Sequence, residues 1–458
     1  MPFSGVIVGL AALGLFLVAL LLLEATRDKR FDSGLYSDEP EWIAISILHW
    51  RQVALGEPPA GAERQPRELR SEDPWRQGVQ DTTFGYMNPG LPKLLLGGIL
   101  FAAGHRSASP LVFQRLQGGA SREEVERAKA ALLPAMPLAR RVVLTLAALS
   151  GVLLALIARE VVGGRWGWLA AALALALWVA SPLVRFTAAY IRTDYFMLPF
   201  TLGAMLLVLR ARAALSGRRG ARPLLVASLG LGLLCGLAVA SKFNGGLVCA
   251  ALAVALPIVW WRAGDERRVS FARGPLAGLA LAGITAATVF YVLNPVLWRD
   301  PFGGLRDMLQ RWSELMAYFQ DDWAPRTGVE VARTPLERVA LFLDRTLGRD
   351  EPWRGLTGLP GGVVLLLAGL AGLSMVALRA PPFHGAAPSE RDAALVALIF
   401  AGVLVAGTAL WLPLDWERFY LPAAPAVVLL EACAIALAAR AIFGRRARTT
   451  GAVAGKST

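Results

Sequence analysis

Long apolar runs recur along the whole chain, and they limit what it can fold into more than any other feature. Each is about 17–25 residues long, the length an α-helix needs to cross the hydrocarbon core of a bilayer. Hydrophobic residues make up 55% of the 458 residues, which is typical of a polytopic membrane protein. We therefore expect an all-α membrane protein with about ten spans, near 4–23, 138–158, 166–182, 195–210, 223–240, 244–261, 275–293, 356–379, 393–412 and 421–440.

Two apolar segments need a separate interpretation. The first run, 4–23, follows an uncharged start and has a longer apolar core than a signal peptide. No clear small-residue cleavage site follows it, so we expect a retained span. The segment 89–104 is shorter and broken by prolines, which favours a re-entrant or interfacial helix.

Basic residues are concentrated in alternate loops. The loop near 210–222 carries five arginines and no acid, the loop near 262–273 carries four arginines, and the C-terminal tail is basic as well. Because Lys and Arg collect in cytoplasmic loops, these segments predict the cytoplasmic side. The domain prediction is then a membrane domain, 1–440, with large outer loops at 24–137 and 294–355, and a basic cytoplasmic tail, 441–458. Within the first loop, Ser121 to Glu124 reads as a helix-capping box.

The net charge of +13 has an ordinary explanation in such a protein. Basic residues in cytoplasmic loops and near anionic lipid account for it, so nucleic acid is not an expected partner. The three cysteines, Cys235, Cys249 and Cys433, all fall within apolar runs and read as small buried hydrophobes. No zinc motif is present, although Asp38, Glu39 and Glu41 are candidate ligands for a divalent metal.

Polar segments gather on the predicted outer side, each next to the end of a span. They are Asp38-Glu39, 87–95, 185–196, 241–246, 294–301 and 415–422. Polar groups next to lipid are costly, so they are functional candidates by default. This one-sidedness predicts a site at the outer membrane–water boundary, with a carboxylate pair and three candidate cations, Arg192, Lys242 and Arg418.

Each of these residues also has a purely structural interpretation. Asp38 or Glu39 would cap the helix that Pro40 begins. Arg192 and Asp194 would form an ion pair at a helix start. Lys242 would reach to lipid phosphate, and Arg418, among aromatic residues, would anchor the chain at the interface. These alternatives stay open at the level of sequence.

The order of these segments resembles that of the integral-membrane glycosyltransferases of the GT-C fold, in particular the protein O-mannosyltransferase and aminoarabinose-transferase superfamily. An Asp-Glu pair after the first span is matched by Asp38-Glu39. A His-Pro-Pro-Leu-x-Lys motif is similar to Asn88–Lys93, with Asn in place of His and Gly90 in place of the second Pro. The acidic residue that often precedes that motif is missing.

Three later segments extend the resemblance over about residues 1–440. Arg192-Thr193-Asp194 is similar to an Arg-x-x-Asp segment but is one residue tighter. Lys242–Gly245 resembles a Lys-aromatic-x-Gly segment, and Arg418–Pro422 resembles an Arg-aromatic-x-Leu-Pro segment. No single motif is highly specific; their order and sidedness carry the likeness.

The resemblance implies transfer of a sugar from a polyprenyl-phosphate donor to an acceptor hydroxyl, with inversion, at the extracytoplasmic face of a bacterial inner membrane. It implies Asp38 as the base with Glu39 in support, and donor-phosphate contacts from Arg192, Lys242 and Arg418. Substrate contacts are implied for Asn88, Lys93, Asp194 and Tyr420. The expected partners are the lipid-linked sugar, membrane lipid and an acceptor lipid, glycan or protein. The alternatives are a transporter or flippase without catalysis, favoured by charges near the middle of spans, and a noncatalytic scaffold.

Overall fold

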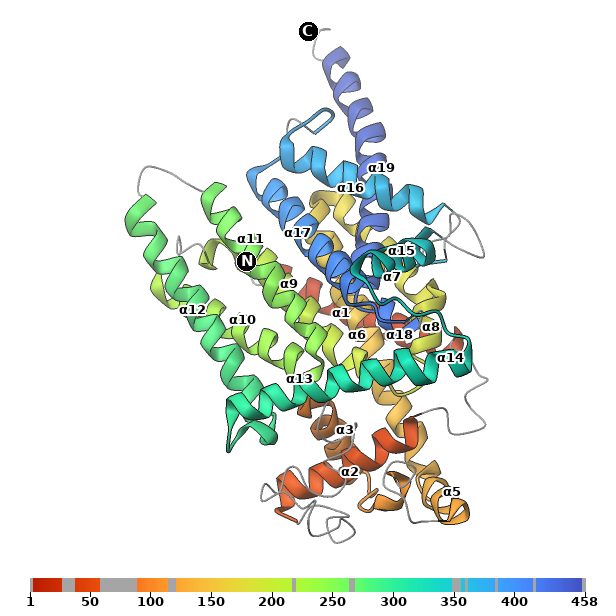
Figure 1. Cartoon of the computed structure of the whole chain (residues 1–458). Helices are drawn as coiled ribbons and strands as arrows, with labels where there is room; N and C mark the ends of the chain where they lie inside the picture. The colour runs from red at the N-terminus through yellow and green to blue at the C-terminus, as the bar shows by residue number, and fades with distance from the viewer. Residues whose placement is uncertain are drawn as a thin grey trace.

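The computed structural model describes residues 3–26, 38–57, 89–113, 121–215, 220–262, 268–347, 356–358, 361–383, 386–414 and 417–454. Helices dominate this part of the chain (Figure 1). A single antiparallel bridge, between Val331 and Leu414, is the only strand-like pairing among the described residues.

Every predicted span is a helix in the structure. The ten helices are α1 (Phe3–Thr26), α6 (Met136–Val162), α7 (Gly164–Ala180), α9 (Asp194–Leu215), α10 (Ala221–Ser241), α11 (Gly246–Arg262), α12 (Arg268–Val292), α16 (Gly362–Leu378), α17 (Pro388–Trp411) and α19 (Ala424–Ala454). Six of them, α6, α9, α10, α12, α17 and α19, are long and apolar enough to cross a membrane, whereas the apolar parts of the other four are shorter. The chain is thus an integral membrane protein, and the count of ten spans stays a prediction.

These helices pack side by side into one bundle with a continuous apolar core. Small residues allow close approach, as expected where helices associate within lipid. At Gly232 of α10, an added Cβ would lie 2.4 Å from the carbonyl oxygen of Ala282 on α12, so only glycine fits that contact. The last helix, α19, continues to Ala454, past the boundary at 440 predicted for the tail.

The first large loop forms a helical layer below the bundle in Figure 1. It contains α2 (Glu39–Leu55), α3 (Gly90–Ala102) and α5 (Arg122–Ala130). The capping box at the start of α5 is confirmed, because the Ser121 hydroxyl accepts from the Glu124 amide and the Glu124 carboxylate accepts from the Ser121 amide. The helix predicted at 89–104 is α3, which lies in this layer.

One contact fixes the start of α3 to the end of α12. The Gly90 amide donates to Oδ1 of Asn294 at 2.8 Å, and a Cβ at Gly90 would lie 2.0 Å from the carbonyl oxygen of Leu293. The glycine that replaces the second proline of the family motif is therefore required by a close backbone approach. Two segments predicted to lie on one side are thus joined here through Gly90 and Asn294.

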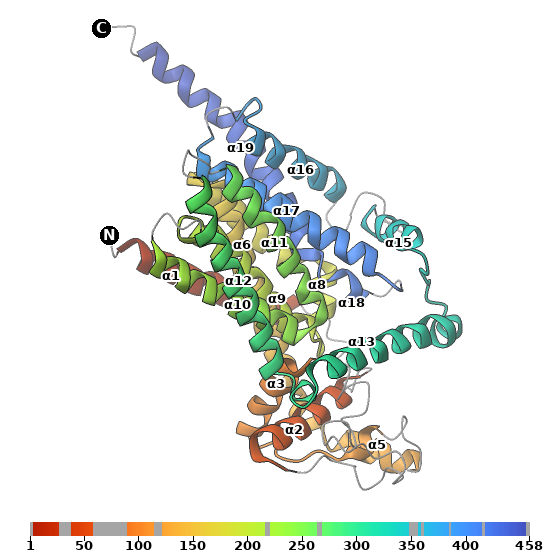
Figure 2. The same cartoon turned by 60° about the vertical axis from the view of Figure 1, so that its left-hand side comes forward.

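The second large loop crosses the same end of the bundle. It contains α13 (Pro301–Tyr318), a π-helical turn (Phe319–Trp323), α14 (Ala324–Thr327) and α15 (Pro335–Leu347). In Figure 2, α13 leaves the lower end of the bundle beside α12 and projects to the right, away from the bundle. A separate apolar cluster joins this arm to the end of α17 and to α18 (Glu417–Tyr420), and Trp312 stacks on Trp411 with ring centroids 4.5 Å apart.

Candidate active site at one end of the bundle

Four of the polar segments predicted from the sequence meet at the end of the bundle that carries α2. They are the start of α2, the residues that precede α9, the C-terminal end of α10 and the short helix α18. Each lies where a helix begins or ends. Their polar side chains therefore gather at the boundary of the apolar bundle and not within it, as the one-sided pattern predicted.

Asp38 lies at the centre of this cluster. It precedes α2, but its side chain makes no capping hydrogen bond, so the capping interpretation of this side chain is wrong. Its Oδ2 accepts from Nε1 of Trp42 at 3.3 Å. Arg192 Nη1 lies 3.4 Å from Oδ1, and Arg418 Nη1 lies 3.9 Å from Oδ2. The carboxylate faces two guanidinium groups and keeps 19% of its surface exposed.

Asp194 and Lys242 form a second ion pair in the same cluster. Lys242 Nζ donates to Oδ1 of Asp194 at 2.6 Å. Asp194 is nearly buried and Lys242 remains 22% exposed. Arg192 and Asp194 therefore take different partners, contrary to the interpretation of them as one structural pair. Because the Asp194 carboxylate binds the Lys242 ammonium, a lipid phosphate is not the sole partner of Lys242.

The cations of the cluster influence each other's pKa. Burial lowers the pKa of Lys242; pairing with Asp194 opposes this shift, and repulsion from Arg418 and Arg192 adds to it. Burial and repulsion from Arg192 lower the pKa of Arg418 to about 10, against the attraction of Asp38. Burial also acts against the charge of Arg192, but Asp38 and other neighbours outweigh it and raise that pKa. The cations crowd one another, as they do where a site holds an anion.

Glu39 has a different place from Asp38. Its side chain is fully buried, and it accepts two hydrogen bonds from Arg140 of α6, at 2.9 and 2.5 Å. Its Oε1 also accepts from the Ile191 amide at 3.1 Å. The Glu39 carboxylate thus ties the start of α2, next to Asp38, to the backbone next to Arg192. This geometry favours a positioning role for Glu39 over the supporting catalytic role that the family resemblance implied.

Glu41 completes the acidic trio but is paired with a different cation. It pairs with Lys129 of α5 at 3.5 Å, and burial raises its pKa against the opposing effects of its own backbone and of Lys129. Asp38, Glu39 and Glu41 thus face three different sets of cations. Within the described ranges no three Asp, Glu, His or Cys side chains are grouped to hold a metal ion. The trio does not fit a divalent metal.

Of the two substrate-contact residues predicted in the 88–93 motif, only Lys93 is among the described residues. Asn88 lies outside the described residues. Lys93 lies on α3 with 2% of its surface exposed, and burial lowers its pKa to about 7. Lys93 belongs to the helical layer that packs on α2. Its substrate contact remains a prediction.

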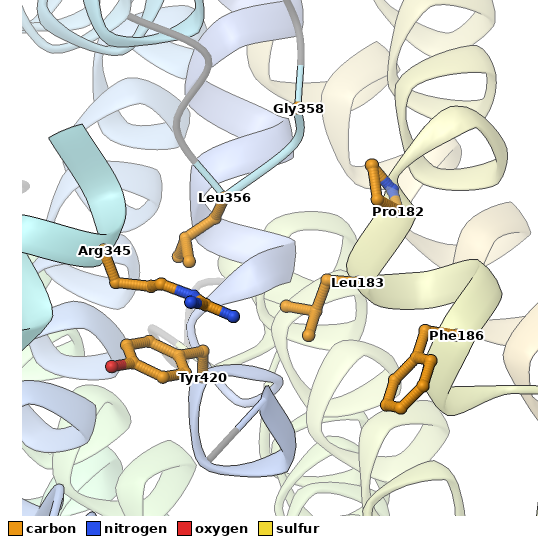
Figure 3. A pocket seen from close by; sticks show the side chains of 7 residues that line it. All are labelled: Pro182, Leu183, Phe186, Arg345, Leu356, Gly358 and Tyr420. Atoms are coloured by element: carbon orange, nitrogen blue, oxygen red, sulfur yellow. The ribbon is translucent and has the colours of Figure 1, made fainter. Parts of the chain in front are cut away.

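Tyr420, the last predicted substrate residue, lines a pocket beside the cluster. The pocket has a volume of about 250 Å³ and is lined by Pro182, Leu183, Phe186, Arg345, Leu356, Gly358 and Tyr420. Figure 3 shows Arg345 reaching from α15 between Leu356 and Tyr420, with Leu183 and Phe186 of α8 (Pro182–Thr187) on the opposite wall. Tyr420 therefore lies on the pocket side of α18, two residues from Arg418.

Sequence reasoning did not find Arg140, Tyr190 or Arg345. Arg140 looks in sequence like an ordinary basic residue at the start of a span, and only its contact with Glu39 shows its role. Tyr190 lies under Arg192, with the guanidinium carbon 4.2 Å from the ring centroid. It was contained in the predicted segment 185–196, so an aromatic residue two positions before an arginine was the available signal.

Neither family models nor curated protein sequences give a match to this chain. Solved structures do. The archaeal oligosaccharyltransferase AglB from Archaeoglobus fulgidus, in complex with an inhibitory peptide and a dolichol-phosphate, aligns with a TM-score of 0.53 and 15% identity, over 96% of this chain and 52% of that one. The oligosaccharyltransferase of the same organism in complex with Zn and sulfate aligns with a TM-score of 0.51 and 16% identity, over 94% and 50%.

ArnT from Cupriavidus metallidurans, bound to undecaprenyl phosphate, aligns at a lower TM-score of 0.45, with 16% identity over 94% of this chain and 60% of that one. The chain spans about half the length of the oligosaccharyltransferase that it matches. At these identities the likeness shows the fold. The chain has the GT-C fold that the order of its motifs predicted.

Proposed function

We propose that this protein is a glycosyltransferase that moves a sugar from a polyprenyl-phosphate donor to an acceptor hydroxyl, with inversion, at the extracytoplasmic membrane face. The observation that carries the proposal is the cluster itself. One partly exposed carboxylate, Asp38, lies among three cations, Arg192, Lys242 and Arg418, where the apolar bundle ends. A GT-C fold whose solved examples include a complex with dolichol-phosphate supports it.

The chemistry asks for a base at the water boundary. The acceptor oxygen attacks the anomeric carbon and forms the new glycosidic bond, while the bond from that carbon to the donor phosphate oxygen breaks. The hydroxyl proton passes to Asp38, and the electron pair of the broken bond leaves with the phosphate. Asp38 suits this role because its carboxylate is held by Trp42 yet remains accessible.

The leaving polyprenyl phosphate gains negative charge during the reaction. Preorganised cations lower the barrier most when they are already in place before the charge develops. Arg192 and Lys242 are each fixed by a carboxylate, and Arg418 lies within 3.9 Å of Asp38. We assign the donor phosphate to these three cations, with Asp194 holding Lys242 and Glu39 holding the elements together.

Substrate contacts are assigned to Lys93, Asn88 and Tyr420. We also propose that the enzyme lies in a bacterial inner membrane and that it transfers either a hexosyl or a pentosyl group. The transporter alternative is not favoured, because the charge clusters described above lie at helix ends. The buried Glu431 is an exception within α19, but it lies seven residues from the start of that helix and accepts from the Thr357 hydroxyl at 3.0 Å.

The test uses the purified full chain in liposomes with a panel of radiolabelled polyprenyl-phosphate sugars. We expect time-dependent loss of one donor in the wild type, and binding without loss in Asp38→Asn. Transport of labelled donor across the bilayer with no breakdown would contradict the enzyme and favour the flippase. Equal donor loss in both proteins would remove Asp38 as the base.

A further inference from the structure

We propose that three arginines, Arg262, Arg379 and Arg391, form a binding site for one anionic phospholipid, whose phosphate they hold. The site lies at the end of the bundle opposite α2, where α11 and α16 end and α17 begins (Figure 1). This end carries the basic loops that are predicted to be cytoplasmic. The site is separate from the cluster around Asp38, and it does not depend on the proposed function.

Two of the three cations start from the same turn of backbone. Nη2 of Arg262, the last residue of α11, donates to the carbonyl oxygen of Ala377 at 2.9 Å. Arg379 follows two residues later and caps α16, with its amide bonded to the last turn of that helix. Both arginines are exposed. One guanidinium is thus held in place by α16, beside the residue that carries the second.

The third cation, Arg391, comes from the start of α17. Arg379 and Arg262 both repel its guanidinium, whereas Asp392 attracts it. Asp392 is shared, since it also attracts Arg212. Nε of Arg391 is buried and makes no hydrogen bond with any described residue. Three like charges that are held together with one shared acid attract an anion.

The backbone of Arg379 gives a second indication of function. Its φ is +57°, and among the described residues it alone has a positive φ without being glycine. Glycine commonly occupies this position after a helix, because it adopts the left-handed conformation without a steric cost. With arginine the backbone is strained, and a cation stands at the end of α16 in return. Strain of this kind is often retained where a residue serves a function.

Exposed apolar side chains lead along two helices to these arginines. On α11, Ile258 and Val254 lie one and two turns before Arg262 on the same face, and they are 39% and 47% exposed. On α16, Leu378 directly precedes Arg379 and is 77% exposed. A free phosphate ion does not cover such side chains, whereas the acyl chains of a phospholipid do. The neighbouring apolar and cationic surfaces therefore favour a lipid-borne phosphate over a free one.

The excess of positive charge also selects among phospholipids. A zwitterionic headgroup brings its own cation close to the phosphate, and the three arginines repel that cation. The headgroup of phosphatidylglycerol contains no cation. We therefore expect an anionic phospholipid to bind more tightly than a zwitterionic one that has the same acyl chains.

The experiment measures binding of radiolabelled phosphatidylglycerol to the purified, delipidated full chain in detergent. We expect one tightly bound lipid per protein, with a Kd about 10-fold or more below that of phosphatidylcholine with the same chains. Arg391→Gln should raise the Kd about 10-fold or more, because a charge-assisted contact is lost. Arg391→Lys should retain part of the affinity. Equal Kd values for the two lipids would overturn the proposal.

The variant Arg379→Gly separates binding from folding. Glycine removes the cation but accepts the positive φ, so the variant should unfold at no lower temperature than the wild type. Its Kd for phosphatidylglycerol should nevertheless rise about 10-fold or more. Thermal unfolding and lipid binding are measured on the same preparation. Normal lipid affinity in a folded Arg379→Gly protein would overturn the site.

Two control variants locate the bound lipid. Arg210→Gln removes an arginine of the same end that pairs with Glu160, and it should leave the Kd unchanged. Arg192→Ala removes a cation of the cluster around Asp38 and should also leave it unchanged. A loss of lipid binding in Arg192→Ala that equals the loss in Arg391→Gln would place the lipid at the other end and contradict the proposal.

Two further measurements separate the phosphate from the lipid that carries it. Glycerol 3-phosphate has the phosphate without acyl chains, and it should displace phosphatidylglycerol only at a far higher concentration than unlabelled phosphatidylglycerol does. Leu378→Asn should weaken binding of the lipid and leave binding of glycerol 3-phosphate unchanged. Displacement by glycerol 3-phosphate and by unlabelled lipid at the same concentration would show a site for free phosphate and overturn the phospholipid as the ligand.

Discussion

The two ends of the bundle use the same residue types for different purposes. At the end that carries α2, Arg192 is almost buried, and the cations there crowd around Asp38 and Asp194. At the other end, Arg210 pairs with Glu160 and Arg440 with Glu390, all of them more exposed than Arg192. The difference between the ends lies in what else the arginines contact.

At that second end the arginines also close the ends of helices. Arg440 donates to the carbonyl of Val162, the last residue of α6, at 3.1 Å. Arg262 donates to the carbonyl of Ala377, near the end of α16, at 2.9 Å. Cations near helix C-termini satisfy free carbonyls and the helix dipole. These arginines bind backbone carbonyls, whereas Arg192 and Arg418 contact the carboxylate of Asp38, where we propose that the donor phosphate binds.

The first test of this comparison asks on which side of the membrane each end lies. Its readout, thiol labelling, is all or none. A cysteine at Ser313 of α13 should react with a membrane-impermeant thiol reagent in intact cells, and one at Ser389 of α17 should not. Both positions are exposed in the structure, so access decides the outcome. Labelling of Ser389 alone would place the proposed active site in the cytoplasm.

The largest graded effect is expected for Asp38→Asn. Asparagine keeps the size and the hydrogen bond from Trp42 but cannot take a proton, so sugar transfer should fall about 10²–10⁴-fold. Donor binding, measured on the same preparation, should persist. The matched change at the other end, Glu160→Gln, should leave transfer unchanged. Similar losses in both variants would mean that the two clusters serve one structural purpose.

A smaller loss, in stability, is expected for Glu39→Gln. Removing one partner of a buried ion pair leaves the other charge without compensation, which typically costs about 3–5 kcal/mol of unfolding free energy. Glu390→Gln, in the partly exposed pair with Arg440, should cost about 0–1 kcal/mol. Denaturant unfolding in detergent compares the two. Equal losses would show that burial does not distinguish the ends.

Next come the phosphate cations. Arg192→Ala and Lys242→Ala should each weaken use of the lipid-phosphate donor by about 1.5–3 kcal/mol, or roughly 10- to 150-fold, in protein that remains folded. Arg210→Ala, from the opposite end, serves as the control and should leave the donor KM unchanged. Normal turnover in the first two variants would place the phosphate elsewhere.

The smallest effect concerns pH. Because burial and neighbouring arginines lower the pKa of Lys242, its charge is lost at a lower pH than that of an ordinary lysine, about 10.4. Donor affinity should therefore decline as pH rises, starting below that value. Lys242→Arg should keep its charge and flatten the profile. A profile that is the same in both proteins would show that Lys242 does not contribute its charge to binding.

Much of the fold could be predicted from the sequence, because each helix of the bundle corresponds to an apolar run of its own. The cluster around Asp38 could also be predicted, since its members follow the ends of those runs on one side. Contacts between residues far apart in the sequence could not be predicted. Nothing local to Arg140 points to Glu39, and nothing local to Gly90 points to Asn294, which is 204 residues away. Arg345 remained unnoticed because the pocket exists only after three short helices have packed together.

The contact of Asp38 with Arg418 has a consequence for how the chain is made. Arg418 follows Asp38 by 380 residues along the chain. At about 5–20 residues per second, the ribosome delivers Arg418 tens of seconds after Asp38. During that interval the carboxylate lacks one of its two guanidinium partners. The cluster around Asp38 is thus completed only after α18 has been made, and a nascent chain that stops before α18 carries Asp38 without Arg418.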